Sequence, residues 1–170
     1  MITDRALDAV REWRKHTALE RAFDALRELM PESRRGRSFQ ALFGQFARGE
    51  GWNVDESEGG SGEELDLVLS NGGLYYILEC RWKADPVEAK EIRDFQGKLR
   101  KRSGVFGLFV SMSGYTAGAT GEAVGGAGDA PTLFVGPGEI ADLFARRLDF
   151  AGLLSDKRRQ LVLRREIPCR

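Results

Sequence analysis

The sequence predicts an α/β domain in which a mixed sheet is flanked by helices. Two alternating segments separated by Asn71-Gly72-Gly73 predict an antiparallel hairpin. A helical pattern over residues 85–102 then leads to the apolar run VFGLFVSM at residues 105–112. A helix between two strands of one sheet predicts a right-handed crossover and a parallel pair. At 170 residues, the chain suits one domain with a substantial core.

Two helices are predicted before the first strand. Apolar residues recur at helical spacing over residues 3–30, and Pro31 ends that pattern. We expect this N-terminal unit, residues 1–32, to pack on the domain or to mediate dimerisation. Residues 38–50 predict a second, amphipathic helix, with four apolar residues on one side: Phe39, Leu42, Phe43 and Phe46.

The central hairpin follows a short strand predicted at residues 52–55 and an acidic, glycine-rich loop. Residues 65–70 and 74–83 both alternate between apolar and polar side chains. If Gly72-Gly73 forms the two-residue loop, Asp66 faces Glu79 directly. If Asn71-Gly72 forms it, the pairing slips by two residues and the two acids still share a face. Both registers bury the same set of side chains.

The C-terminal part completes the sheet and adds helices. Residues 105–112 predict a strand buried on both faces, and residues 115–128 predict a short helix or a loop. A further strand is predicted at residues 133–135 and a helix at 138–148, which the arginine-rich tail can continue. The domain is expected to span residues 33–150, with a basic C-terminal extension at 151–170.

Composition excludes several classes of site. The cysteines, Cys80 and Cys169, form no C-x-x-C pair, and His16 is the only histidine. Zinc sites of the Cys/His kind and Ser-His or Cys-His nucleophiles are therefore not expected. No segment reaches the roughly 18 apolar residues of a membrane span. The first residues lack the apolar core of a signal peptide, so we expect a cytoplasmic protein.

The formal net charge of zero conceals separated clusters. Seven acids and no base lie between residues 50 and 66, whereas residues 98–102 read KLRKR and the tail is rich in arginine. An acidic centre flanked by basic patches suits a metal-dependent enzyme that acts on a phosphate polymer. Solvated helix and loop surfaces are the alternative explanation of such charge runs.

Asp66 and Glu79 are the candidate catalytic pair. Carboxylates opposite each other on two strands repel, which costs roughly 0.2–1 kcal/mol, and a shared cation would remove that repulsion. Their oxygen ligands suit Mg²⁺ or Mn²⁺. Arg81 and Lys83 follow Glu79 on the same face and add positive charge to the site. A ladder of cross-strand salt bridges on a solvated face is the alternative.

The run from Gly36 to Tyr115 resembles the Mrr-like branch of the PD-(D/E)xK restriction-endonuclease superfamily. The order and spacing of its short motifs carry the resemblance. They are Arg35-Gly36 with Phe39 and Leu42, Gly51-Trp52, Glu64-Leu65-Asp66, YYILECRW from Tyr75, Asp85-Pro86-Val87, Phe95-Gln96-Gly97-Lys98, and GLFVS from Gly107 to Gly114-Tyr115.

The resemblance implies a core of αβββαβ type and Mg²⁺- or Mn²⁺-dependent hydrolysis of phosphodiester bonds, usually in DNA. Asp66 and Glu79 take the places of the metal-binding acids, and Cys80 would offer its backbone carbonyl. Glu64 and Gln40 are accessory positions. Gln40 stands where many relatives have a glutamate, which weakens any metal contact there.

Arg81 occupies the position of the family's lysine, and this is the main departure. Lys83 can do the work of that lysine from the same face. Alternatively, Arg81 suffices because the metal activates water, or catalysis is lost. An arginine is too basic to accept a proton and can only clamp charge.

We therefore predict a metal-dependent endonuclease with a role in restriction, defence or repair. The alternative is a catalytically impaired module that binds nucleic acid or a protein. The crossover helix is expected to contact nucleic acid through Gln96, Lys98, Arg100 and Lys101. DNA is the predicted partner, and RNA is the alternative. No membrane contact is expected, and a homodimer would allow cleavage of both strands.

Overall fold

The structure is a computed structural model that describes residues 4–29, 32–57 and 66–170. Its centre is a five-stranded mixed sheet in the order β1-β2-β3-β4-β5. The strands are β1 (Asn53–Ser57), β2 (Asp66–Asn71), β3 (Leu74–Arg81), β4 (Val105–Ser111) and β5 (Thr132–Val135). Pairs β1–β2 and β2–β3 are antiparallel, and pairs β3–β4 and β4–β5 are parallel. The mixed sheet and the parallel crossover are thus confirmed.

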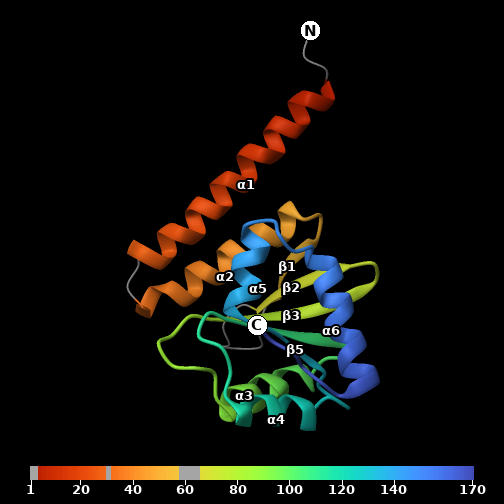
Figure 1. The fold of residues 1–170 in the computed structure, drawn as a ribbon. Helices are drawn as coiled ribbons and strands as arrows, with labels where there is room; N and C mark the ends of the chain where they lie inside the picture. The colour runs from red at the N-terminus through yellow and green to blue at the C-terminus, as the bar shows by residue number, and fades with distance from the viewer. Residues whose placement is uncertain (1–3, 30–31, 58–65) are drawn as a thin grey trace.

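Helices cover both faces of the sheet (Figure 1). They are α1 (Asp4–Leu29), α2 (Glu32–Gly49), α3 (Ala89–Leu99), α4 (Ala117–Gly125), α5 (Pro137–Phe144) and α6 (Phe150–Arg164). Helices α3 and α4 lie on one face, and α2, α5 and α6 lie on the other. The order α2-β1-β2-β3-α3-β4 is the predicted αβββαβ core. Among the described residues, no helix has the length and apolar character to cross a membrane.

The β2–β3 hairpin adopts the first of the two predicted registers. Asn71 pairs with Leu74, and Leu67 pairs with Leu78. Gly72 and Gly73 form the loop with φ values of 59° and 79°. A two-residue turn with positive φ at both positions favours glycine because a Cβ atom is strained there.

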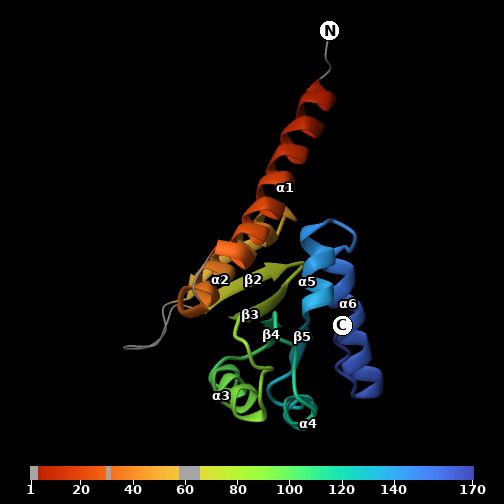
Figure 2. The same cartoon turned by 60° about the vertical axis from the view of Figure 1, so that its left-hand side comes forward.

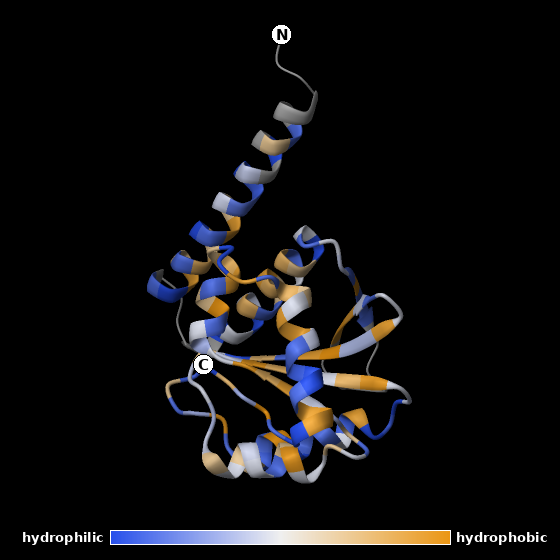
Figure 3. Ribbon diagram, turned by 45° about the vertical axis from the view of Figure 1, so that its right-hand side comes forward, coloured by the Kyte–Doolittle hydropathy of each residue, from blue (hydrophilic) through white to orange (hydrophobic). Residues whose placement is uncertain are grey.

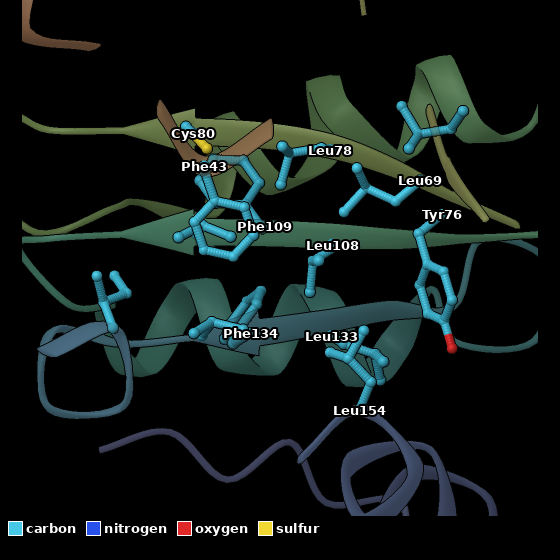
Figure 4. Close-up of a cluster of buried hydrophobic side chains, with 14 of the residues drawn as sticks. Phe43, Leu69, Tyr76, Leu78, Cys80, Leu108, Phe109, Leu133, Phe134 and Leu154 are labelled. Carbon is cyan, nitrogen blue, oxygen red and sulfur yellow. The ribbon is translucent and has the colours of Figure 1, made fainter. Parts of the chain in front are cut away.

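The core lies mainly between the sheet and α2, α5 and α6. Leu78, Leu108 and Leu133 are fully buried on neighbouring strands, and Leu154 of α6 joins the same cluster (Figure 4). Apolar residues accordingly concentrate along the strands, whereas hydrophilic residues run along α1 (Figure 3). On the other face, the Phe95 ring of α3 packs edge-on against Phe109 of β4 at 5.3 Å.

Two helix starts differ from the prediction. Helix α2 begins at Glu32, not Ser38, and includes the basic cluster of residues 34–37. Helix α3 begins at Ala89, later than expected, because Val87 forms an isolated parallel bridge with Tyr115. That bridge holds the chain extended directly after Pro86, where proline also disfavours helix in the residue before it.

The tail predicted as a basic extension folds onto the domain. Asp149 caps a separate helix, α6, by accepting a hydrogen bond from the Gly152 amide at 2.6 Å. Leu153, Leu154 and Leu161 of this helix are buried. Residues 151–170 therefore contribute to the core as well as to the charge of the surface.

Candidate metal and nucleic-acid site

Glu79 lies near the end of β3 with its carboxylate buried. Its side chain is 7% exposed; Oε1 lies 2.6 Å from Arg81 Nη1, and Oε2 lies 3.4 Å from Lys98 Nζ. Alternation along β3 turns Glu79 toward the face that α3 covers. A buried charge is costly unless it is paired, so the two cations stabilise this position.

Glu91 is a member of the site that the sequence interpretation missed. Its Oε1 lies 2.7 Å from Lys83 Nζ and 3.6 Å from Arg81 Nε. Its Oε2 accepts a hydrogen bond from the Glu88 amide at 3.1 Å, which anchors it in the first turn of α3. The one available signal was an acid in the first turn of a helix, where it complements the helix dipole.

The pKa of Glu91 is lowered by this network. Burial alone raises the pKa of the carboxyl, but hydrogen bonds from Lys83 and from the Glu88 amide outweigh it, with help from the charges of Lys83 and Arg81. Arg81 therefore stands between two carboxylates, Glu79 and Glu91. Lys83 makes its ion pair with Glu91.

The structure describes the backbone position of Asp66. It begins β2, and the register that pairs Leu67 with Leu78 brings Asp66 and Glu79 to equivalent steps of the two strands. The Asp66 side chain and the whole of Glu64 lie outside the described residues. The predicted carboxylate pair stays a prediction.

Cys80 and Gln40 meet at the strand. The Cys80 amide donates a hydrogen bond to Gln40 Oε1 at 3.4 Å, so the accessory residue on α2 reaches the site through the β3 backbone. Burial raises the pKa of the Cys80 thiol well above its ordinary value, and the charge of Glu79 adds to that shift. The thiol is therefore a core group, and metal binding by the backbone carbonyl of Cys80 stays a prediction.

The predicted contacts on the crossover helix divide into three kinds. The prediction that Gln96 contacts nucleic acid was wrong. Its side chain is completely buried, and Nε2 donates to the carbonyls of Ala123 and Ala130 at 3.4 Å. Lys98 reaches Glu79 instead of pointing away from the sheet. Arg100 is exposed and pairs with Asp129 at 2.9 Å, and Lys101 is exposed beside it.

A groove of about 790 Å³ opens beside these residues, between α2 and the strands β1–β3. Cys80, Arg81, Trp82 and Lys83 form part of its wall, together with Glu91. The α2 side contributes Gly36, Arg37, Gln40, Ala41, Gly44, Gln45 and Arg48. The buried acid Glu79 thus adjoins a groove that carries four basic residues.

The donor atoms fit a hard divalent cation. Mg²⁺ is usually held by one or two carboxylates and keeps several waters. Glu79 and the Cys80 carbonyl are oxygen donors of that kind. Among the described side chains, no group of three or more His, Cys, Asp or Glu could hold a metal ion. Asp66 is the donor that would complete the set.

Comparisons with known proteins bear on the family and the fold of the chain. A restriction endonuclease family model, the Mrr catalytic domain, matches residues 32–137. The fold is similar to that of the DNA modification-dependent restriction endonuclease AspBHI, with a TM-score of 0.51, 15% identity and 84% of this chain covered. The MspJI restriction endonuclease, solved with a 27-mer oligonucleotide, gives a TM-score of 0.46 at 16% identity, covering 89% of this chain and 35% of that one.

The match is to part of a larger protein, since the chain spans 38% of the length of AspBHI. No curated protein matches the chain. The family model, however, covers more than half of the residues, from the start of α2 to the start of α5. The chain belongs to the Mrr-type restriction endonuclease family.

Proposed function

We propose that the chain is a Mg²⁺- or Mn²⁺-dependent endonuclease that hydrolyses phosphodiester bonds of DNA. The observation that carries this proposal is Glu79, a buried carboxylate near the end of β3 whose partner Arg81 lines a basic groove. A buried acid destabilises the fold. A site that must bind both a metal cation and a phosphate backbone gives such an acid a function.

Asp66, Glu79 and the Cys80 carbonyl would hold the metal. When bound, Mg²⁺ would supply Lewis-acid polarisation of a phosphate oxygen and a lowered pKa for a bound water. Gln40 would act indirectly, because it accepts a hydrogen bond from the Cys80 amide and so fixes the strand that carries two of the donors. Glu64 is a further accessory candidate.

The basic residues would bind and orient the phosphate. Arg81 carries a guanidinium that stays protonated and can clamp a phosphate with two parallel hydrogen bonds. Lys98 holds the other oxygen of Glu79, and Lys83 is aligned by Glu91 at the rim of the same groove. In the proposed mechanism, Arg81 would contact the reacting phosphate and Lys83 would support it.

A non-catalytic nucleic-acid-binding module is the second candidate. The observation that favours it is Arg81 in the lysine position, with its Nη1 only 2.6 Å from Glu79 Oε1. An ion pair this close neutralises the carboxylate without any metal. Such a chain would bind DNA and leave it uncut.

Plasmid nicking separates the two candidates. The chain is incubated with supercoiled plasmid and Mg²⁺ or Mn²⁺, beside an EDTA control and the Glu79→Gln variant. We expect metal-dependent nicking that falls to the level of the enzyme-free control in Glu79→Gln. Binding without nicking in either metal would favour the second candidate, and nicking that survives Glu79→Gln would reveal a contaminant.

Two further measurements address the choice of substrate and the oligomeric state. An RNA of matched sequence, offered at equal concentration, tests the choice of DNA. A homodimer would allow both strands to be cut in one encounter, and its presence is measured by sedimentation with and without DNA. Restriction, defence and repair are the roles that such an activity would fit.

A further inference from the structure

The α2 wall of the groove is a polar stripe. After Gly36, it consists of six residues that recur at spacings of one or three along one face of the helix: Arg37, Gln40, Ala41, Gly44, Gln45 and Arg48. The core side of the same helix carries Phe39, Phe43 and Phe46. The stripe contains two arginines and two amides and no acid, so its hydrogen-bonding groups suit an anionic partner.

The two arginines are spaced to contact different phosphates. Arg48 is eleven positions after Arg37, which is about 16 Å along a helix axis. Both side chains are exposed. Arg48 also donates to the Val54 carbonyl at 3.2 Å, and this contact directs its guanidinium along the groove toward β1.

The opposite wall carries charge of both signs. Arg81 and Lys83 line it together with Glu91, and Lys83 neutralises that acid at 2.7 Å. Glu56 of β1 is the other acid that lines the groove. Among the described residues that line the groove, four are basic and two are acidic, so the described lining carries a net positive charge.

The size of the groove limits the length of polymer that it holds. Pockets of about 300–1,000 Å³ hold ligands of drug size. A volume of about 790 Å³ therefore accommodates a few linked nucleotides of one strand.

From the stripe, the charge and the volume, we infer that α2 binds the backbone of a single DNA strand and leads it to Glu79. Arg37 and Arg48 hold two phosphates at the ends of the stripe, and Gln45 donates a hydrogen bond to a phosphate between them. The small side chain of Ala41 leaves room for the sugars. This inference rests on the proposed function, because it describes how the substrate reaches that site.

Salt-dependent binding tests the inference without requiring cleavage. Anisotropy of a fluorescein-labelled 12-nucleotide single strand is measured in EDTA at several KCl concentrations. Each phosphate contact contributes about 0.7 to the slope of log K against log salt for a single strand. We expect the double variant Arg37→Ala/Arg48→Ala to lower the slope by about 1.4.

A matched control removes the same charge elsewhere. Arg159 and Arg164 are exposed on α6, and Arg159→Ala/Arg164→Ala should leave the slope unchanged. Because Arg48 also contacts β1, a variant that adds charge is needed as well. Gln45→Lys should raise the slope by about 0.7 and tighten binding.

Three results would overturn the inference. One is an equal loss of slope in the stripe variant and the α6 variant. Another is an effect of the stripe variant on a duplex but not on the single strand. The third is a wild-type chain that fails to bind the single strand in EDTA; if that chain still nicks plasmid with Mg²⁺, the proposed function stands without the stripe, whereas absence of both binding and nicking overturns both.

Discussion

At the scale of single residues, the site is governed by two acids that share one arginine. Glu79 Oε1 lies 2.6 Å from Arg81 Nη1, and Glu91 Oε1 lies 3.6 Å from Arg81 Nε. Lys98 and Lys83 complete the two pairs from α3 and from the end of β3. Removal of any one cation leaves each acid with a remaining partner, so single substitutions of these bases should change function more than they change folding.

Replacement of Arg81 by lysine tests its assignment to the lysine position. We expect Arg81→Lys to keep or raise the rate of plasmid nicking, because an ammonium preserves the charge at Glu79 and can also exchange a proton. Arg81→Ala should lower the rate, and Lys83→Ala should lower it less. Initial nicking rates with Mg²⁺ measure all three. Arg159→Lys, exposed on α6 and outside the groove, is the matched control, and a clear loss in Arg81→Lys would contradict the assignment.

The lowered pKa of Glu91 predicts a pH-dependent contribution to stability. A depressed pKa means that the ionised acid stabilises the fold at pH values above its unfolded-state pKa of about 4.3, and that this contribution is lost as the pH falls through the lower folded pKa. Urea midpoints of wild type and Glu91→Gln should therefore differ at pH 7 and converge toward pH 3. Glu56→Gln, on exposed β1, serves as the control. A gap that widens at low pH would refute the prediction.

The acidic residue on β3 was predictable, and the polar residues on α3 were not. Strand alternation alone put Glu79 and Arg81 on one face. Gln96 is four residues after Ile92 and so lies on the inner side of α3, but a glutamine at that position reads as a surface residue. Helix α4, which covers Gln96, could not be told from a loop in a segment so rich in glycine.

At the scale of elements, the hairpin was easier to predict than the helix starts. The sequence placed its turn at Asn71-Gly72-Gly73 but left two registers open, and the positive φ values of Gly72 and Gly73 identify the register that forms. The start of α2 depends on a tertiary contact instead. Arg35 lies over the Trp82 ring at 5.4 Å, and this contact favours helix across Gly36, a residue that costs about 1 kcal/mol in a helix interior. No local pattern reports such a contact.

Helices α5 and α6 are joined by a buried ion pair. Lys157 Nζ lies 2.7 Å from Glu139 Oε1, with side chains 4% and 5% exposed. Lys157 also donates to the Pro168 carbonyl, and Glu139 accepts from the Gly136 amide. One pair thus connects both helices and the chain that follows α6.

Removal of one partner of this pair should destabilise the fold strongly. Lys157→Met leaves Glu139 as a buried unpaired acid, which costs about 3–5 kcal/mol of unfolding free energy. Addition of Glu139→Met should recover much of that loss, because an apolar pair of similar size is tolerated. Urea denaturation measures both. Lys90→Met, in an exposed pair with Asp94, is the control and should do little; a Lys157→Met variant as stable as that control would show that the pair contributes nothing.

At the scale of the whole molecule, α1 is held at one end and projects at the other (Figures 1 and 2). Phe23 stacks on Phe144 of α5 with ring centres 4.6 Å apart and contacts Trp82 at 5.7 Å. Trp13, ten residues earlier in the same helix, is 67% exposed. The helix therefore closes the core with its second half, next to the wall of the groove.

This asymmetry predicts that the two halves of α1 contribute unequally to stability. Phe23→Ala should cost about 3–5 kcal/mol, because the ring fills the space between α2, α5 and β3. The described side chains of residues 1–14 are all exposed: Asp8, Ala9, Arg11, Trp13 and Arg14. We expect removal of this segment to change the unfolding free energy by no more than about 0.5 kcal/mol, as is usual for exposed positions. Urea denaturation of both variants, with Leu19→Ala as an intermediate case, measures the difference. A truncation that destabilises as much as Phe23→Ala would mean that the projecting half is covered in solution, and sedimentation would then show whether a second copy of the chain covers it.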